Sequence, residues 1–187
     1  MKIIAITGGI GSGKSYASEY VKSKGYGEIS CDEITKDLYR KQEIIDNVIS
    51  MFPFANDNGK PDYAKISEKV FSDEISRKRL ENYLHPLIMK EVFERAKNMG
   101  DIVFVEVPLL FESGLQDKFD GVLVIVRDKK DRINAVKERS GLSEAQIIAR
   151  INSQFDYSKV DKDKYTVVTN SGNKDFDIAL EKYLKTL

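Results

Sequence analysis

The sequence lacks several features that would place it outside the cell or on a membrane. It has one cysteine, Cys31, so no disulfide can form within the chain, which suits a reducing cytosol. No apolar run approaches the roughly 20 residues of a membrane-spanning helix, and no signal-peptide pattern opens the chain. Lys plus Arg and Asp plus Glu both number 30, so the basic excess usual in nucleic-acid and membrane-surface binders is missing. We expect a cytoplasmic protein that binds neither nucleic acid nor membrane.

What the chain does contain, near its N-terminus, is a phosphate-binding pattern. Residues 8–15 read Gly-Gly-Ile-Gly-Ser-Gly-Lys-Ser and fit G-x-x-x-x-G-K-[ST]. The apolar residues 2–7 predict a buried strand, and residues 16–24 predict a helix. Glycines let backbone N–H groups close around phosphate oxygens, and the helix N-terminus adds partial positive charge. In this P-loop, Lys14 is expected to reach the β- and γ-phosphates, and the Ser15 hydroxyl to ligate Mg²⁺.

The rest of the chain alternates apolar runs with helical patterns. Strands are predicted over 28–31, 101–107, 119–126 and 165–169. Five strands alternating with helices, the P-loop on the first, indicate an α/β fold of P-loop NTPase type, with a five-stranded parallel doubly wound sheet. No internal repeat or low-complexity segment is present, and 187 residues suffice for one such core with inserted subdomains.

Residues 33–99 are mostly helical in pattern and exceed what a simple crossover between strands needs. This insertion predicts a substrate-binding subdomain. Its helices are expected over 63–71 and 73–97, the second kinked or broken at His85-Pro86. Between them and the preceding helices, residues 53–61 predict a loop, with Asn58-Gly59 as its turn.

The C-terminal part predicts three further helices. The first covers residues 129–139, and the second begins at Ser143, where Gln146 completes a capping box. A closing helix is expected over 175–187.

Two carboxylates follow predicted strands, at the edge where open parallel sheets gather their ligands. Asp32 comes after the strand 28–31 and is well placed for chemistry, although its position also fits the N-cap of a helix over 32–40. Glu106 closes the strand 101–107 in the Walker B arrangement, in which a carboxylate holds Mg²⁺ directly or through water.

These residues favour phosphoryl transfer to a small hydroxyl acceptor. A GTPase is excluded, because Asn173-Lys174-Asp175-Phe176 fails the base-reading Asn-Lys-x-Asp and no aspartate lies three residues before a glycine. Transfer needs a base, Mg²⁺ and mobile arginines, and the arginines available beside Gly141 are Arg132, Arg139 and Arg150. Each of them also fits a solvent-facing position on a charged hairpin. Two alternatives stay open: a kinase for another nucleotide or small-molecule hydroxyl, and a non-kinase ATP-binding switch protein.

Five blocks, in order along nearly the whole chain, resemble the dephospho-CoA kinase family. They are Ile6 to Ser15, Asp32, His85-Pro86-Leu87-Ile88, Val107-Pro108-Leu109-Leu110-Phe111-Glu112, and Arg150-Ile151 with Gln154. The resemblance implies transfer of the ATP γ-phosphate to the ribose 3′-hydroxyl of dephospho-CoA, the last step of coenzyme A synthesis. Its cofactor would be Mg²⁺, its partners ATP and dephospho-CoA, and its state a monomer or weak homo-oligomer.

The resemblance also implies a role for individual residues. Asp32 would activate or orient the acceptor hydroxyl. The implied set is Asp32, Lys14 and Arg139 for catalysis; Gly9, Gly11, Ser12, Gly13, Lys14, Ser15, Tyr16 (through its backbone N–H), Arg139 and Arg150 for ATP; Asp32, His85, Pro108 and Leu109 for the acceptor; and Ser15 and Glu106 for the metal. The implied organisation is a core of residues 1–33, 100–131 and 160–187, a helical acceptor subdomain over about 34–99, and a helical lid over about 132–159.

The chain departs from the family's pattern at a few positions. The family usually has Asp-x-Asp after the second strand, and here Ser30 replaces the first aspartate. The family's Thr after the P-loop serine is Tyr16, and an arginine of the acceptor subdomain is replaced by Tyr63. The first lid arginine would fall at Ala135, with Arg132 about one turn earlier. Contacts at these positions therefore cannot be carried over from the family.

Overall fold

The computed structural model describes residues 1–172 and 174–187 of the chain. It divides into two compact units, one formed by Met1–Ser30 and Ala96–Leu187 and the other by Cys31–Arg95. Each unit is described separately.

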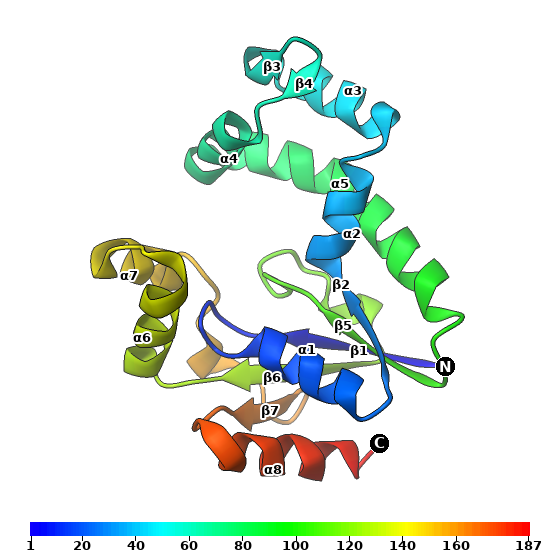
Figure 1. The fold of residues 1–187 in the computed structure, drawn as a ribbon, viewed down its shortest axis with the longest axis vertical. Coiled ribbons are helices and arrows are strands. Elements are labelled where there is room, and N and C mark those ends of the chain that lie inside the picture. The colour runs from blue at the N-terminus through cyan, green and yellow to red at the C-terminus, as the bar shows by residue number, and fades with distance from the viewer. The chain divides into compact units, whose positions relative to one another are not determined.

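The larger unit is built on a five-stranded sheet (Figure 1). Its strands are β1 (Lys2–Thr7), β2 (Gly27–Ser30), β5 (Ile102–Glu106), β6 (Gly121–Val126) and β7 (Thr166–Thr169). They lie in the order β2-β5-β1-β6-β7, and every neighbouring pair is parallel. The predicted five-stranded parallel α/β sheet is therefore confirmed, with strand ends that differ from the expected ones by one or two residues.

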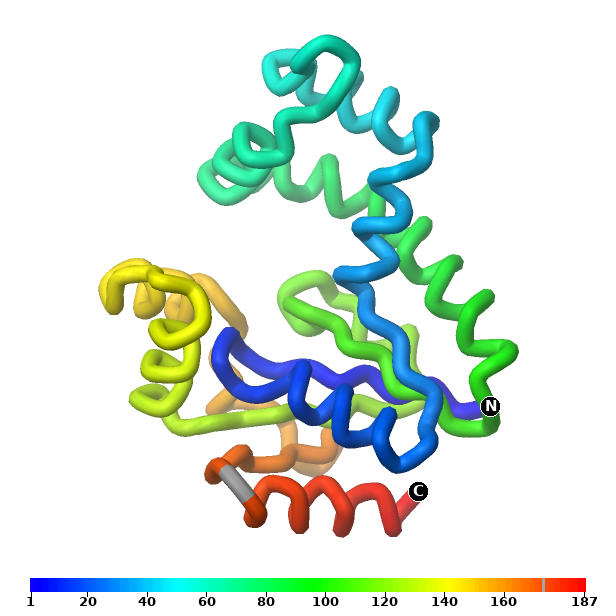
Figure 2. Tube along the Cα trace, viewed as in Figure 1, coloured from blue at the N-terminus to red at the C-terminus, as the bar shows by residue number. Residues whose placement is uncertain are grey.

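The helices of this unit connect and cover those strands. They are α1 (Lys14–Ser23), α6 (Lys129–Ser140), α7 (Glu144–Asn152) and α8 (Asn173–Leu184), with 3-10 turns at Gln116–Lys118 and Tyr157–Lys159. The predicted capping box is present, because the Ser143 side chain accepts from the Gln146 backbone N–H while the Gln146 side chain accepts from the Ser143 N–H. Figure 2 shows the chain leaving β6, forming the α6–α7 hairpin and returning to the sheet before β7.

The core explains why the strands read as unbroken apolar runs. A parallel sheet is covered on both faces, so residues of either parity are buried. One face packs against α1 and α8 through a cluster of fully or almost fully buried side chains: Ile4, Ile6, Ala17, Val21, Phe104, Leu123, Ile125, Val168, Phe176, Leu180 and Leu184. Alternate residues such as Ala5, Val103 and Val105 are equally buried.

The strand register brings the candidate functional residues to one edge. Glu106 at the end of β5 is paired with Ile6 of β1 on one side and with Ser30 of β2 on the other. Because these strands are parallel, their carboxyl ends meet where the P-loop begins, just after Thr7.

The smaller unit is mainly helical. It contains α2 (Cys31–Leu38), α3 (Gln42–Met51), a 3-10 turn (Pro53–Ala55), α4 (Tyr63–Ser72) and most of α5 (Glu74–Ala96). A short antiparallel hairpin, β3 (Asn56–Asp57) with β4 (Lys60–Pro61), joins α3 to α4. Its turn is the predicted Asn58-Gly59, and both residues have positive φ (51° and 83°), as a type I′ turn requires. The two strands themselves were not predicted, because two residues carry no alternation pattern.

The predicted interruption at His85-Pro86 is wrong, because α5 runs unbroken from Glu74 to Ala96 with Pro86 inside it. A proline removes one backbone donor, here the bond to the Asn82 carbonyl, but leaves the bonds of the turns on either side. Buried side chains on both sides of the proline, such as Leu84 and Val92, hold the helix against its neighbours. Tertiary packing outweighs the local penalty.

No helix in the described part of the chain is long and apolar enough to cross a membrane.

Candidate active site

The P-loop occupies the turn between β1 and α1, so the predicted strand–loop–helix context is confirmed. The loop closes on itself, because the Ser12 N–H donates to the Gly9 carbonyl at 3.1 Å. Gly13 precedes α1 with φ 102°, a conformation that residues with a Cβ rarely adopt. A Cβ there would also overlap the Nδ2 atom of Asn170. Only glycine fits this position.

Two side chains that follow the loop take part in its geometry. The Lys14 ammonium donates to the carbonyls of Gly8 (2.8 Å) and Gly9 (3.2 Å). The Ser15 hydroxyl donates to Glu106 Oε1 at 2.9 Å, across 91 positions of sequence. The residues predicted as the metal pair therefore lie in direct contact.

This pair has the chemistry of a partial magnesium site. A hydroxyl and a carboxylate are both oxygen donors, which Mg²⁺ prefers, and Mg²⁺ in kinases is typically held by one or two protein groups plus substrate phosphates. Among residues 1–172 and 174–187, no group of three or more His, Cys, Asp or Glu side chains is arranged to hold a metal by itself. The donor set thus fits a metal ion that is shared with a nucleotide.

Asn170 is a P-loop contact that the sequence did not reveal. It follows β7 directly and is buried, with its backbone N–H donating to Val126 at 2.7 Å. Its side-chain Nδ2 donates to the Ser12 carbonyl at 2.8 Å, so the last strand of the sheet fixes the P-loop. The available signal was a polar residue immediately after a buried strand.

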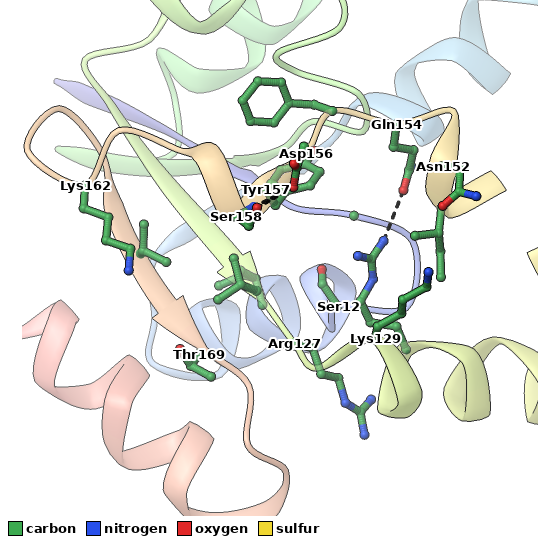
Figure 3. A pocket seen from close by; sticks show the side chains of 17 residues that line it. Ser12, Arg127, Lys129, Asn152, Gln154, Asp156, Tyr157, Ser158, Lys162 and Thr169 are labelled. Carbon is green, nitrogen blue, oxygen red and sulfur yellow. Dashed lines mark hydrogen bonds between the residues drawn. The ribbon is translucent and has the colours of Figure 1, made fainter. Parts of the chain in front are cut away.

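A cavity of about 840 Å³ lies beside the P-loop (Figure 3). Gly9 and Ser12 line it on the loop side. Its charged lining is mostly basic, with the described residues contributing four cationic side chains and one carboxylate: Arg127, Lys129, Arg132, Lys162 and Asp156. A cavity of this size and charge favours an anionic ligand.

The segment that leaves α7 is fixed against the loop after β5. The Phe155 N–H donates to Glu112 Oε1 at 2.7 Å, and the Phe155 ring lies 4.8 Å from that of Phe111. Burial raises the pKa of Tyr157 to about 12, and the nearby Glu112 charge acts in the same direction, so this phenol stays protonated at neutral pH.

The same loop carries the predicted acceptor residues Pro108 and Leu109. Leu109 has φ 55°, which is unusual for a non-glycine residue, and its side chain is 41% exposed. Strained backbone and exposed apolar surface, three residues after Glu106, are typical of a ligand-facing position. We take this as support for a binding role.

The predicted lid arginines are separated from the P-loop. Arg139 in the last turn of α6 and Arg150 in the last turn of α7 are both exposed. Within the described residues, neither guanidinium hydrogen-bonds to residues 8–15. Tyr16 is half exposed, and its hydroxyl donates to Asp177 Oδ1 at 2.6 Å.

Two predicted site residues belong to the smaller unit. Asp32 is the second residue of α2, so the N-cap interpretation is wrong. Its exposed carboxylate lies in the first turn, where the helix dipole favours negative charge. His85 is half-buried on α5, and burial lowers its pKa against the opposing effect of Glu81, so a neutral imidazole is favoured at pH 7.

Comparison with known proteins places these features in a family. A profile of the family "Dephospho-CoA kinase" matches residues 2–175. A dephospho-CoA kinase from Fusobacterium nucleatum is 31% identical over 189 residues, covering 99% of this chain and 98% of the relative. A crystal structure from Thermus thermophilus superposes with a TM-score of 0.87 at 33% identity, covering 99% of this chain and 95% of that one. The dephospho-CoA kinase from Campylobacter jejuni gives a TM-score of 0.66 at 29% identity, covering 98% and 95%.

Proposed function

Because the chain belongs to the dephospho-CoA kinase family, we propose that its P-loop binds ATP and that Asp32 prepares the 3′-hydroxyl of dephospho-CoA for phosphoryl transfer. The reaction itself, phosphorylation of a hydroxyl by a kinase, follows from membership of the family. The proposal concerns which residues of this chain carry it out.

The observation that carries the donor site is the contact between Ser15 and Glu106. A hydroxyl at the N-terminus of α1 and a carboxylate at the end of β5 meet at 2.9 Å beside a loop shaped by glycine. Bound there, Mg²⁺ would neutralise charge on the transferring phosphate. Lys14 binds the β- and γ-phosphates once its ammonium exchanges the Gly8 and Gly9 carbonyls for phosphate oxygens. The proposed metal ligands are therefore Ser15 and Glu106.

Chain connectivity supports the role of Asp32. β2 ends at Ser30, which is paired with Glu106, and Asp32 lies only two residues farther along. Two residues span at most about 7 Å, so the backbone of Asp32 is held near the strand ends. Since Ser30 replaces the family's first aspartate, Asp32 is the nearest carboxylate after this strand. It would orient the acceptor hydroxyl and accept its proton.

The remaining predicted roles complete the proposal. Arg139 and Arg150 approach the phosphates from an α6–α7 lid over about 132–159, and the segment of about 34–99, with His85, serves as the acceptor subdomain. Pro108 and Leu109 contact the acceptor from the loop after β5. We propose a cytoplasmic enzyme, monomeric or weakly self-associating, that binds neither nucleic acid nor membrane.

A panel of acceptors tests this function against the two alternatives. Purified protein is incubated with ATP, Mg²⁺ and one acceptor at a time: dephospho-CoA, AMP, dCMP, shikimate or gluconate. ADP release should require dephospho-CoA and should stop when EDTA removes Mg²⁺. Faster ADP release with another acceptor would indicate a different kinase, and equal ATP hydrolysis with and without any acceptor would indicate a switch protein.

A further inference from the structure

The backbone of Ile10, in the middle of the P-loop, is held from both sides. Its N–H donates to Gln154 Oε1 at 2.7 Å, and its carbonyl accepts from Arg132 Nε at 2.8 Å. The two side chains also meet, because Arg132 Nη2 lies 3.5 Å from Gln154 Oε1, as the dashed line in Figure 3 shows. One residue of the loop is thus clamped by two residues that are 22 positions apart.

The Arg132 guanidinium is fitted closely to the loop. A Cβ at Gly9 would overlap its Nη2 atom, so the arginine occupies the space that the glycine leaves. The side chain is half-buried, and burial lowers its pKa, yet arginine keeps its proton in such settings. Its guanidinium forms no ion pair with a carboxylate in the part of the chain that the structure describes. Its binding partner is the P-loop backbone.

The clamp joins the loop to both ends of the α6–α7 hairpin. Arg132 lies in the first turns of α6, and Gln154 lies two residues after α7 ends. Gln154 is itself held in place, because the next residue, Phe155, donates its N–H to Glu112. The base of the hairpin is therefore attached to the P-loop, whereas Arg139 near its tip is exposed.

From this geometry we propose that Arg132 and Gln154 are positioning residues that hold the P-loop in its nucleotide-binding shape through Ile10. The clamp uses only the N–H and carbonyl of Ile10, which leaves the following loop residues for the phosphates. Arg132 then acts on the loop and not as the phosphate-binding lid arginine that is missing at Ala135. The inference rests on the proposed nucleotide site but not on the identity of the acceptor.

Titration calorimetry with ADP and no acceptor tests the clamp. Gln154→Ala and Arg132→Ala should each weaken ADP binding by about tenfold, since each removes a hydrogen bond to the loop. The double variant should be little weaker than either single one, because both act through Ile10. An additive loss of about 100-fold would contradict the clamp and indicate that Arg132 binds phosphate directly. Unchanged ADP affinity in both single variants would also overturn it.

Conservative variants and a local readout separate positioning from loss of structure. Gln154→Glu keeps an acceptor for the Ile10 N–H and should restore ADP affinity. Arg132→Lys keeps the charge but loses the planar fork, and it should weaken ADP binding like alanine. Hydrogen exchange of residues 8–13 without nucleotide should speed up in Gln154→Ala and not in the controls Lys130→Ala and Asn134→Ala, which alter exposed side chains of α6. Equal exchange in Gln154→Ala and the controls would refute the clamp. Because no acceptor is present, these results stand whether or not dephospho-CoA is phosphorylated.

Discussion

Replacing Asp32 by asparagine is expected to lower kcat by about 10²- to 10⁴-fold, with the Kd for ATP unchanged within about twofold. Asparagine keeps the size of the side chain but can neither accept the proton of the acceptor hydroxyl nor carry the negative charge. Folding should be little affected, because the side chain is exposed and its interaction with the dipole of α2 is worth only about 0.3–1 kcal/mol. Steady-state kinetics with dephospho-CoA and calorimetry with ATP provide both numbers.

Glu33→Gln is the matched control, because it removes the same charge from the same first turn of α2. It should retain wild-type kcat within a few fold. If Asp32→Asn also keeps a kcat close to wild type, or if both variants lose activity equally, Asp32 contributes only to the helix and the proposed role is wrong.

Replacing Arg139 by alanine is expected to lower kcat by about 10³-fold with little change in the KM for dephospho-CoA. The side chain is exposed in the last turn of α6, so it has no buried contact to lose. It would act only when the α6–α7 hairpin closes over the nucleotide and brings its charge to the transferring phosphate. Rapid-quench measurement of a single turnover isolates this step from product release.

Two variants of the same helix test whether charge alone explains the effect. Lys137→Ala removes a neighbouring exposed charge of α6 and should leave kcat near wild type. Arg139→Lys should recover only part of the rate, because lysine lacks the planar fork that binds two phosphate oxygens. An Arg139→Ala variant that raises the KM for dephospho-CoA while keeping kcat would move Arg139 out of the phosphate role.

Local signals predicted the fold and half of the donor site. The P-loop needs only residues 8–15 between a strand and a helix, and the structure places it there. Glu106 was predicted from the apolar strand that it closes, and the parallel sheet then brings it to Ser15. Both predictions used patterns that are complete within a few residues, plus one rule about where parallel strands end.

Contacts made by single polar side chains across the chain could not be predicted. Asn170 reaches Ser12 over 158 positions, and Gln154 reaches Ile10 over 144. Neither residue carries a periodic pattern, and each partner is a backbone group, which every residue has. Arg132 was predicted among the mobile arginines of the hairpin, whereas the structure binds it to the Ile10 carbonyl. Its position in three dimensions, and not its charge, decides what it does.

Proline gave the opposite error, because a local rule was strong and the tertiary context outweighed it. Pro86 removes one hydrogen bond from α5, but the helix continues through buried residues on either side. The error falls in the smaller unit and does not alter the donor site.

The central claim is that this P-loop passes the γ-phosphate of ATP to the 3′-hydroxyl of dephospho-CoA. Its most direct measurement uses ATP labelled in the γ-phosphate, Mg²⁺ and dephospho-CoA, with the products separated and the labelled phosphate located by mass spectrometry. We predict that all transferred label is recovered as the 3′-phosphate of CoA, with one ADP formed for each CoA. Label recovered as inorganic phosphate, or on any other position of the acceptor, would contradict the account.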